Sequence, residues 1–299
     1  MGPVNLVRLA ALMERGQGMP EIAIALIDGP VALNHPDLAA ASVLEISRSG
    51  VSGKPKGACA MADTVACTHG TFVAGMLFAR RGSVAPAICP GCTLFLRPVF
   101  AEAPNGNGQM PGATLEELAA AIIECVNSGA RIINLSSALL QASPKGERQL
   151  EDALNHAAHR GVITVAAAGN QGMVGSSAIT GHVWVIPVAA CDMRRRPLRE
   201  SNLGKSIGRR GLSAPGEDIT SLGTNGKPQT LGGTSAAAPF VTGAIALLWS
   251  EFRGATAAQI KMAVIQAGNA RRGTIAPPLL DAWTAYQSLA SAHTGRSMQ

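Results

Sequence analysis

The sequence is poor in aromatic and in charged side chains. Aromatic residues make up 3% of its 299 positions, and charged residues make up 15%. Proteins that hold nucleic acid strands combine basic grooves with aromatic rings on which the bases stack. Because basic and aromatic residues are not interleaved in this chain, we expect no nucleic-acid partner.

The positive charge is small and dispersed. The net charge of +6 includes arginine clusters at 80–81, 194–196, 209–210 and 271–272. Such clusters are typical of solvated loops. The sequence leaves open a sharper interpretation, in which one of them recognises an acidic segment of a substrate.

Long uninterrupted hydrophobic runs are also missing. Arg8, Glu14 and Arg15 interrupt the N-terminal segment, so the sequence lacks a signal peptide pattern. No later run free of charge, glycine and proline is long enough to span a membrane. We therefore expect a cytoplasmic protein without a membrane partner, unless a leader has been removed.

The cysteines allow three interpretations. Cys89 and Cys92 have the CxxC spacing, but no helix that would complete a redox motif follows them. Cys59 and Cys67 could complete a zinc site with this pair, or two of the cysteines could form a loop disulfide. Free structural thiols are the third possibility.

Hydrophobic residues, in contrast, make up 47% of the chain and follow an alternating pattern of strands and helices. This pattern predicts an α/β fold with a parallel sheet and one large domain at 22–290. A helix with a linker precedes it at 1–21, and a tail follows at 291–299. The expected strands are 22–27, 94–99, 131–135, 162–167 and 183–189, and the expected helices are 4–15, 68–77, 115–127, 147–159, 257–267 and 278–289.

Ser235 has the surroundings of a nucleophile. Two glycines precede it at 232–233, where the backbone can turn tightly, and three alanines that favour helix follow at 236–238. The hydroxyl would then lie in the first turn of a buried helix, beside unpaired backbone N–H groups. A serine needs a histidine base and an orienting carboxylate to act as a nucleophile.

Asp28 and His69 are candidates for these two roles. Asp28 follows a strand that we expect to be buried, where open α/β sheets place their sites. His69 would lie in the first turn of a core helix, where the positive end of the helix dipole favours the neutral base. Each residue alone has an ordinary alternative, because Asp28 could cap a turn and His69 could cap a helix.

Asn170 stands just beyond the strand at 162–167, in a glycine-rich turn. Its amide NH₂ could donate a hydrogen bond to a developing oxyanion, as acyl transfer requires. Asparagine is also common in such turns for conformational reasons alone.

Together, these segments resemble the subtilisin-like serine proteases. The resemblance lies in the segments 24–29, 35–38, 69–75, 166–170 and 233–239, and in the chain order Asp, His, Ser. It implies a three-layer α/β/α fold with a mostly parallel central sheet. It also implies that Ser235 attacks the scissile carbonyl, that His69 transfers the proton, that Asp28 orients His69, and that Asn170 stabilises the oxyanion.

The resemblance also implies where the substrate lies. Its backbone would pair with the segment at 136–138, as an added strand. The residues expected to bind substrate are Ser136, Ser137, Ala138, Ala167, Ala168 and Gly169.

Several positions depart from the family pattern. Phe72 stands where histidine is common, and Ala138 with Leu139 stands where many members have a glycine pair, which would narrow the specificity pocket. The segment after the His69 helix is short and basic, so we predict no calcium near Asp37. No other metal or cofactor is expected. The segments at 96–100, 132–136 and 212–219 look most like subtilases that mature cyanobactin-type peptides.

The predicted function is a serine endopeptidase of narrow specificity that cuts a peptide or protein precursor. Two alternatives stay open. One is a catalytically silent peptide-binding protein with the same fold. The other is a transpeptidase, which the tight helix after His69 disfavours because it leaves no room there for an inserted lid.

Overall fold

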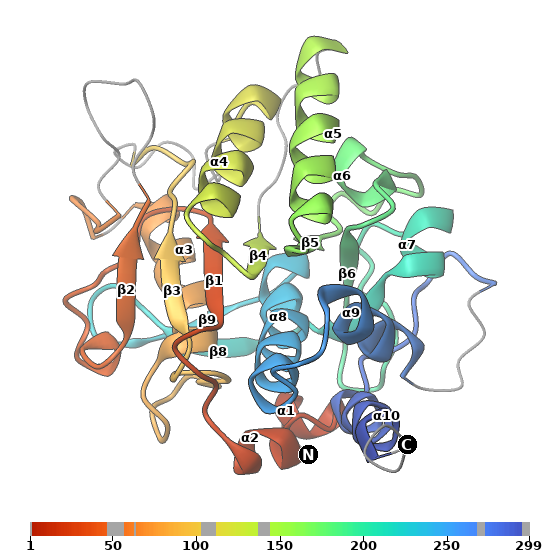
Figure 1. Ribbon diagram of the computed structural model, residues 1–299. Coiled ribbons are helices and arrows are strands. Elements are labelled where there is room, and N and C mark those ends of the chain that lie inside the picture. The colour runs from red at the N-terminus through yellow and green to blue at the C-terminus, as the bar shows by residue number, and fades with distance from the viewer. Residues whose placement is uncertain are drawn as a thin grey trace.

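The computed structural model describes residues 2–46, 57–62, 64–102, 112–136, 144–267 and 273–294. Its centre is a seven-stranded sheet with the strand order β2-β3-β1-β4-β5-β6-β7 (Figure 1). All neighbouring strands in this sheet are parallel. The strands are β1 (Ala23–Ile27), β2 (Ser42–Glu45), β3 (Thr93–Leu96), β4 (Ile132–Leu135), β5 (Ile163–Ala167), β6 (Ile186–Cys191) and β7 (Leu212–Pro215). An antiparallel pair, β8 (Ile219–Leu222) and β9 (Pro228–Leu231), forms a separate small sheet.

Helices cover both faces of the sheet. They are α1 (Pro3–Leu6), α2 (Ala10–Arg15), α3 (Val65–Phe78), α4 (Leu115–Asn127), α5 (Pro144–His159), α6 (Ala178–Gly181), α7 (Lys205–Arg210), α8 (Thr234–Glu251), α9 (Ala257–Gln266) and α10 (Ala282–Thr294), with a short 3-10 helix at Pro36–Leu38.

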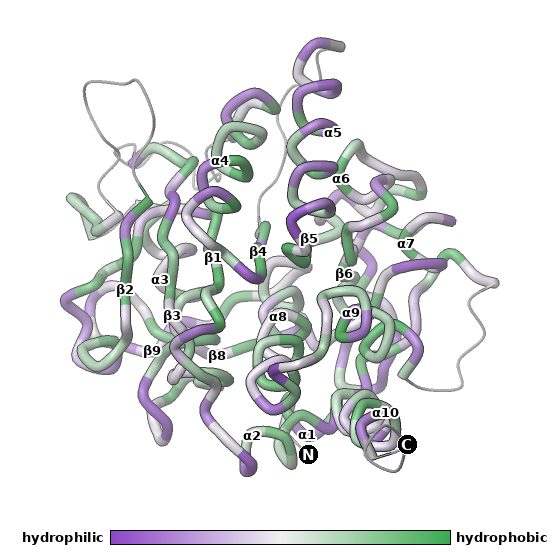
Figure 2. Tube along the Cα trace, in the orientation of Figure 1, coloured by the Kyte–Doolittle hydropathy of each residue, from purple (hydrophilic) through white to green (hydrophobic). Residues whose placement is uncertain are grey.

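Alternate residues of β1 face two different cores. Ile24 and Leu26 belong to the core that contains α3 and α8. Ala23, Ala25 and Ile27 belong to the core that contains α4 and α5. Because successive side chains of a strand point to opposite faces, a strand covered on both sides must be apolar throughout. Figure 2 shows the central strands as hydrophobic. The predicted three-layer α/β/α fold is confirmed.

Some predicted boundaries were wrong. The helix expected at 4–15 is two short helices, α1 and α2, separated at Arg8, which has a φ of 52°. The Arg8 guanidinium pairs with Asp281 at 2.8 Å. The interruption thus lies where the N-terminal segment contacts a residue far along the chain.

The last helix starts later than predicted. The segment at 278–280 is extended, because Ser213 of β7 donates its N–H to the Pro278 carbonyl and accepts from the Leu280 N–H. The strand expected at 183–189 begins at Ile186. Val183 lies in a turn, and its carbonyl accepts a hydrogen bond from the Lys261 ammonium. Tertiary contacts therefore override the local pattern at both places.

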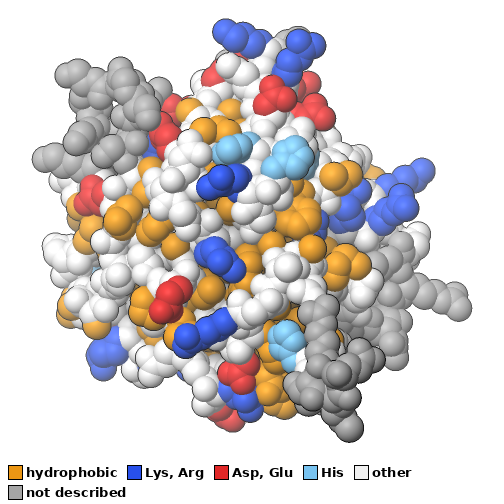
Figure 3. Space-filling model, in the orientation of Figure 1, with side chains coloured by type: hydrophobic (Ala, Val, Ile, Leu, Met, Phe, Trp, Pro, Cys, Tyr) orange, Lys and Arg blue, Asp and Glu red, His pale blue; other side chains and the backbone are white. Residues whose placement is uncertain are grey.

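Charges of both signs are interspersed on the face of the molecule drawn in Figure 3. They do not gather there into one basic patch. Among the described residues, no helix combines the length and the apolar character needed to cross a membrane.

Candidate functional site

Asp28 and His69 meet at the carboxyl end of β1. The Asp28 Oδ1 atom accepts hydrogen bonds from the Gly29 N–H at 2.6 Å and from His69 Nδ1 at 2.7 Å. The Asp28 side chain is fully buried, and 15% of the His69 side chain is exposed. A carboxylate on Nδ1 fixes the tautomer and leaves Nε2 free to accept a proton.

Two glycines permit this approach. A Cβ atom at Gly29 would collide with the Ala66 carbonyl, and one at Gly70 would collide with the Gly29 and Pro30 carbonyls. The turn after β1 therefore lies directly against α3. Thr64 caps this helix by accepting from the Cys67 N–H at 3.2 Å. His69 is consequently the fifth residue of α3 and lies beyond its first turn. The prediction that His69 lies in the first turn was wrong.

The pKa of His69 is raised above its ordinary value of 6.5. Burial is the largest single influence and lowers the pKa of the imidazole, because it disfavours the charged form. The charge of Asp28 and its hydrogen bond together outweigh burial. Asp28 therefore stabilises the imidazolium that would form when His69 takes a proton.

Ser235 is the second residue of α8, as the sequence predicts. The side chain is partly exposed, and α8 packs against α3, the helix that carries His69. Within the described residues the Ser235 hydroxyl makes no hydrogen bond. Its pairing with His69 therefore stays a prediction, and catalytic hydrogen bonds are often long before substrate binds.

Asn170 lies beside the start of α8. Its Oδ1 atom accepts from the Thr234 N–H at 2.8 Å and from the Thr234 hydroxyl at 3.0 Å. These two bonds turn the amide NH₂ away from Thr234. A Cβ atom at Gly233, which has a φ of 91°, would come within 2.8 Å of Asn170 Nδ2. Only glycine leaves Asn170 this space.

Two residues that the sequence did not single out hold this turn in place. The Thr234 hydroxyl also accepts from the Gly169 N–H at 3.1 Å. Asn202 accepts from the N–H groups of Gln171 and Met173 and donates to the Ala168 carbonyl. Thr234 could have been found from the sequence, because it is a small hydroxyl residue next to Ser235. No local pattern marked Asn202.

The predicted substrate-binding residues are described in part. Ser136 follows β4 and is buried, and its hydroxyl accepts from Asn134 Nδ2 at 2.7 Å. Ala167 ends β5, and Ala168 with Gly169 leads from it into the turn at Asn170. Ser137 and Ala138 lie outside the described residues, as does Leu139.

The cysteines do not form the four-thiolate zinc site that the sequence left open. Cys59 and Cys67 form a disulfide, with their Cα atoms 5.7 Å apart. Cys89 and Cys92 are free and buried. The Glu102 carboxylate lies near the disulfide and accepts N–H bonds from the backbone at 60–61, so these atoms are already engaged.

The Asp37 carboxylate forms an ion pair with Arg80. Its Oδ1 atom pairs with the Arg80 guanidinium, at 2.8 Å from Nη2 and 3.0 Å from Nε. One oxygen of this carboxylate thus has a cationic partner, and the absence of calcium near Asp37 stays a prediction.

Comparison with known proteins identifies a family and relatives that cover most of this chain. The subtilase family matches residues 20–282. A thermostable alkaline protease of Halalkalibacterium halodurans is 32% identical over 244 residues, which cover 81% of this chain and 61% of that protein. The chain thus spans less than two thirds of the length of this relative.

Solved structures are similar over almost the whole chain. A mutant of the protease domain of PatA has a TM-score of 0.80 and 31% identity, with 92% of this chain and 98% of that chain covered. The prenylagaramide maturation protease PagA has a TM-score of 0.79 and 29% identity, with 94% and 98% covered.

Proposed function

The chain belongs to the subtilase family, and on this premise we propose that it is a serine endopeptidase that cuts a peptide or protein precursor. Ser235 is the nucleophile, His69 the general base and acid, and Asp28 the residue that orients His69. The hydrogen bond between Asp28 and His69 carries this proposal.

The bond supports the first proton transfer. With Nδ1 donating to Asp28, the neutral imidazole presents the lone pair of Nε2. Nε2 takes the Ser235 proton as the oxygen attacks the scissile carbonyl, and the imidazolium then gives the proton to the leaving amine. The raised pKa of His69 supports this role, because it reflects stabilisation of the charged intermediate form.

Asn170 is the proposed oxyanion donor. The attack moves negative charge onto the carbonyl oxygen of the substrate, and a donor fixed before the reaction stabilises that charge without reorganisation. Thr234 occupies the Oδ1 atom of Asn170 through two hydrogen bonds. The NH₂ group is thereby left to face the substrate beside Ser235.

A peptide precursor is the proposed substrate class. PatA and PagA are maturation proteases for patellamide and prenylagaramide, respectively, and their structures resemble this one at 29–31% identity. We extend this role to the present chain, consistent with the resemblance of its sequence to the cyanobactin-type branch. The precursor would lie extended between Ser136 and the segment at 167–169. Side chains at 138–139 would narrow the pocket for the residue before the cut.

Covalent labelling tests the proposal. Folded protein treated with a fluorophosphonate should gain one adduct on Ser235, and Ser235→Ala should gain none. The same variant should lose peptide hydrolysis by about 10⁶-fold in kcat. Ser250→Ala, a change at the far end of the same helix, is the matched control and should keep the adduct on Ser235. Folded protein that forms no adduct on Ser235 would refute the assignment.

A peptide-library cleavage profile tests the substrate class. Narrow specificity predicts cleavage of few sequences, and a bulky residue before the cut should be rejected. Cleavage of most library members at similar rates would contradict a role restricted to one precursor.

A further inference from the structure

Cys89 and Cys92 converge at the amino end of the sheet, at the opposite end of β3 from the site. The Cys92 N–H donates to the Cys89 carbonyl at 3.0 Å, which closes a tight turn. A Cβ atom at Gly18 would overlap Cys92 Sγ and lie 3.4 Å from Cys89 Cβ. Both side chains therefore face the same point under Gly18, at a separation that a disulfide can bridge.

The two sulfurs are not equivalent. A hydrogen bond from the Cys89 thiol lowers the pKa of Cys92 against the effect of burial, and the Met19 N–H adds to the lowering. The Ser250 hydroxyl, which donates its proton to the Ala246 carbonyl at 2.7 Å, contributes least. Burial raises the pKa of Cys89. Cys92 thus has the greater thiolate character, and the thiolate is the reactive form.

The other two free cysteines provide an internal contrast. Burial raises the pKa of both Cys125 and Cys191 to about 12. Each lies in the core without a neighbouring thiol donor among the described residues. Burial without a neighbouring thiol donor thus raises the pKa of these cysteines, and the paired arrangement offsets this effect at Cys92.

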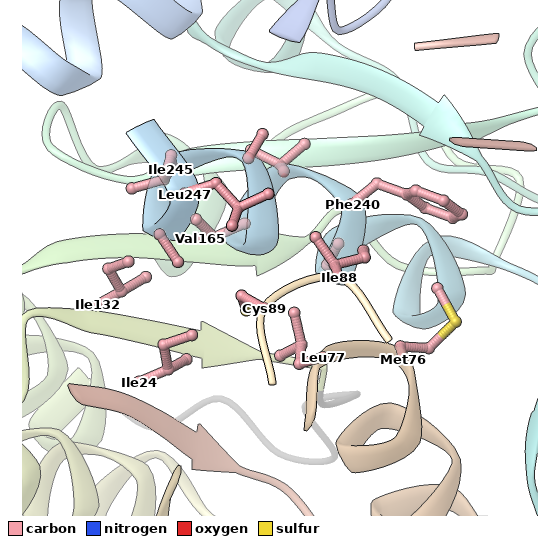
Figure 4. Close-up of a cluster of buried hydrophobic side chains, with 14 of the residues drawn as sticks. Ile24, Met76, Leu77, Ile88, Cys89, Ile132, Val165, Phe240, Ile245 and Leu247 are labelled. Atoms are coloured by element: carbon pink, nitrogen blue, oxygen red, sulfur yellow. The ribbon is translucent and has the colours of Figure 1, made fainter. Parts of the chain in front are cut away.

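The turn also lies between the helices that carry the proposed catalytic residues. Ile88 and Cys89 donate their N–H groups to the Met76 and Leu77 carbonyls at the end of α3. On the other side, a Cβ atom at Gly243 of α8 would collide with Ile88. Figure 4 shows Ile88 and Cys89 between α3 and α8. The turn therefore contacts both helices, and a change in the turn would move groups on both.

A small molecule can come near the pair from outside. A cavity of about 350 Å³ is lined by Gly18, Met19 and Ser250, the residues that cover Cys92. Three charged side chains, those of Arg15, Glu251 and Arg253, line the same cavity, and Arg15 pairs with Glu251. The sulfurs themselves are buried and do not line this cavity, so an oxidant that reaches them must be small.

We propose that Cys89 and Cys92 form a redox-active dithiol that reacts with hydrogen peroxide. The Cys92 thiolate attacks one peroxide oxygen, the O–O bond breaks, and the departing hydroxide takes a proton to become water. The sulfenic acid on Cys92 is then attacked by the Cys89 sulfur. The S–S bond forms as the S–O bond breaks, and the hydroxide leaves with the Cys89 proton as a second water. Two thiols are oxidised and one peroxide is reduced.

Differential alkylation tests this chemistry. Protein reduced with dithiothreitol and desalted is exposed to hydrogen peroxide, denatured, alkylated with N-ethylmaleimide and mapped by peptide mass spectrometry. Cys89 and Cys92 should lose their alkylation together, while Cys125 and Cys191 keep theirs over the same time. In Cys92→Ser, Cys89 should stay alkylated. In Cys89→Ser, a sulfenic acid should be trapped on Cys92 by dimedone.

Unfolded protein is the control for intrinsic reactivity. In urea, all four thiols should react at similar rates, because the hydrogen bonds and burial that distinguish them are lost. The dithiol is refuted if Cys89 and Cys92 in folded protein oxidise no faster than Cys125 and Cys191, or if Cys89 loses its alkylation in Cys92→Ser.

The transmission to the helices has its own readout, which rests on the proposed function. Oxidised protein should label with fluorophosphonate more slowly than reduced protein, and Cys92→Ser should label equally fast with and without peroxide. An unchanged rate in oxidised protein refutes the transmission. Absence of any labelling refutes the proposed function. The alkylation result does not depend on either labelling outcome.

Discussion

The Asp28 carboxylate accepts the Nδ1 hydrogen of His69 at 2.7 Å, across the contact between the end of β1 and α3. The Oδ2 atom of the same carboxylate is buried without a partner among the described residues. A buried carboxylate with an unsatisfied oxygen costs stability. This cost is consistent with a residue that is retained for its action on His69.

Replacement of Asp28 should impair chemistry more than folding. Asp28→Asn keeps the shape of the side chain but allows the wrong tautomer of His69, so kcat should fall by about 10⁴-fold. Asp37→Asn is the matched control, since its carboxylate pairs with Arg80 instead. Steady-state hydrolysis with circular dichroism of each variant checks this. Equal kcat values for the two variants would show that Asp28 has no role in catalysis.

The same change should move the titration of His69. In the native protein its pKa lies above 6.5, so peptide hydrolysis should decline as the pH falls through that raised value and the base becomes protonated. Protonation of His69 also favours the folded state, and this contribution is lost as the pH rises through the folded pKa. Asp28→Asn removes the negative charge that opposes the effect of burial, so the pKa of His69 should fall.

NMR of the imidazole Cε1 protons provides the measurement. His182 is the internal reference, because burial lowers its pKa and its charged neighbours are Glu151, Lys261 and Arg210. Its titration should be the same in both proteins. If the His69 titration does not move between them, Asp28 is not the cause of its raised pKa.

Gly233 should be required for the position of Asn170. Gly233→Ala places a Cβ atom 2.8 Å from Asn170 Nδ2, so Asn170 must shift, and kcat should fall toward the loss of about 10²- to 10³-fold expected for removing an oxyanion donor. Gly226→Ala is the control, since Gly226 also has a positive φ, 75°, but no atom within 4 Å of its Cβ position. Both variants strain the backbone, and only Gly233→Ala should change kcat. A comparable loss of kcat in the two would assign the effect to strain alone.

Arg97 should be more important for stability than any exposed arginine. Its side chain is fully buried and donates to Glu117 at 3.0 Å and to Glu124 at 2.6 Å. Arg97→Met removes the charge that these carboxylates face, at a cost of about 3–5 kcal/mol. The exposed pair of Arg80 with Asp37 should contribute less than about 1 kcal/mol, so Arg80→Met is the control. Urea denaturation measures both, and similar midpoints for the two variants would contradict the prediction.

Local signals were sufficient for several elements. The helix predicted at 115–127 has those bounds in the structure, because Thr114 caps its start and Gly129, with a φ of 95°, follows its end. The continuous apolar run at 22–27 predicted β1, and it predicted that Asp28 lies at the end of this strand. The glycines at 232–233 and the alanines after Ser235 predicted the first turn of α8.

Other features depended on residues distant in sequence. Asn202 holds the turn at Asn170 through a bond from the N–H of Gln171, 31 residues away, so no short window of sequence reveals the contact. The disulfide was one of three open interpretations, because spacing does not say which sulfurs meet. The division of the N-terminal helix at Arg8 likewise coincides with a contact to Asp281, 273 residues later.

The sequence by itself determined the α/β class, the alternation of strands and helices, and which residue types stand at the strand and helix ends. Only the tertiary structure decided that the Asp28 carboxylate lies within hydrogen-bonding distance of His69. The reason is physical: propensity and burial patterns act over a few neighbouring residues, whereas a hydrogen bond of 2.7 Å depends on how closely two distant segments pack. Here the absence of side chains at Gly29 and Gly70 permits that close packing.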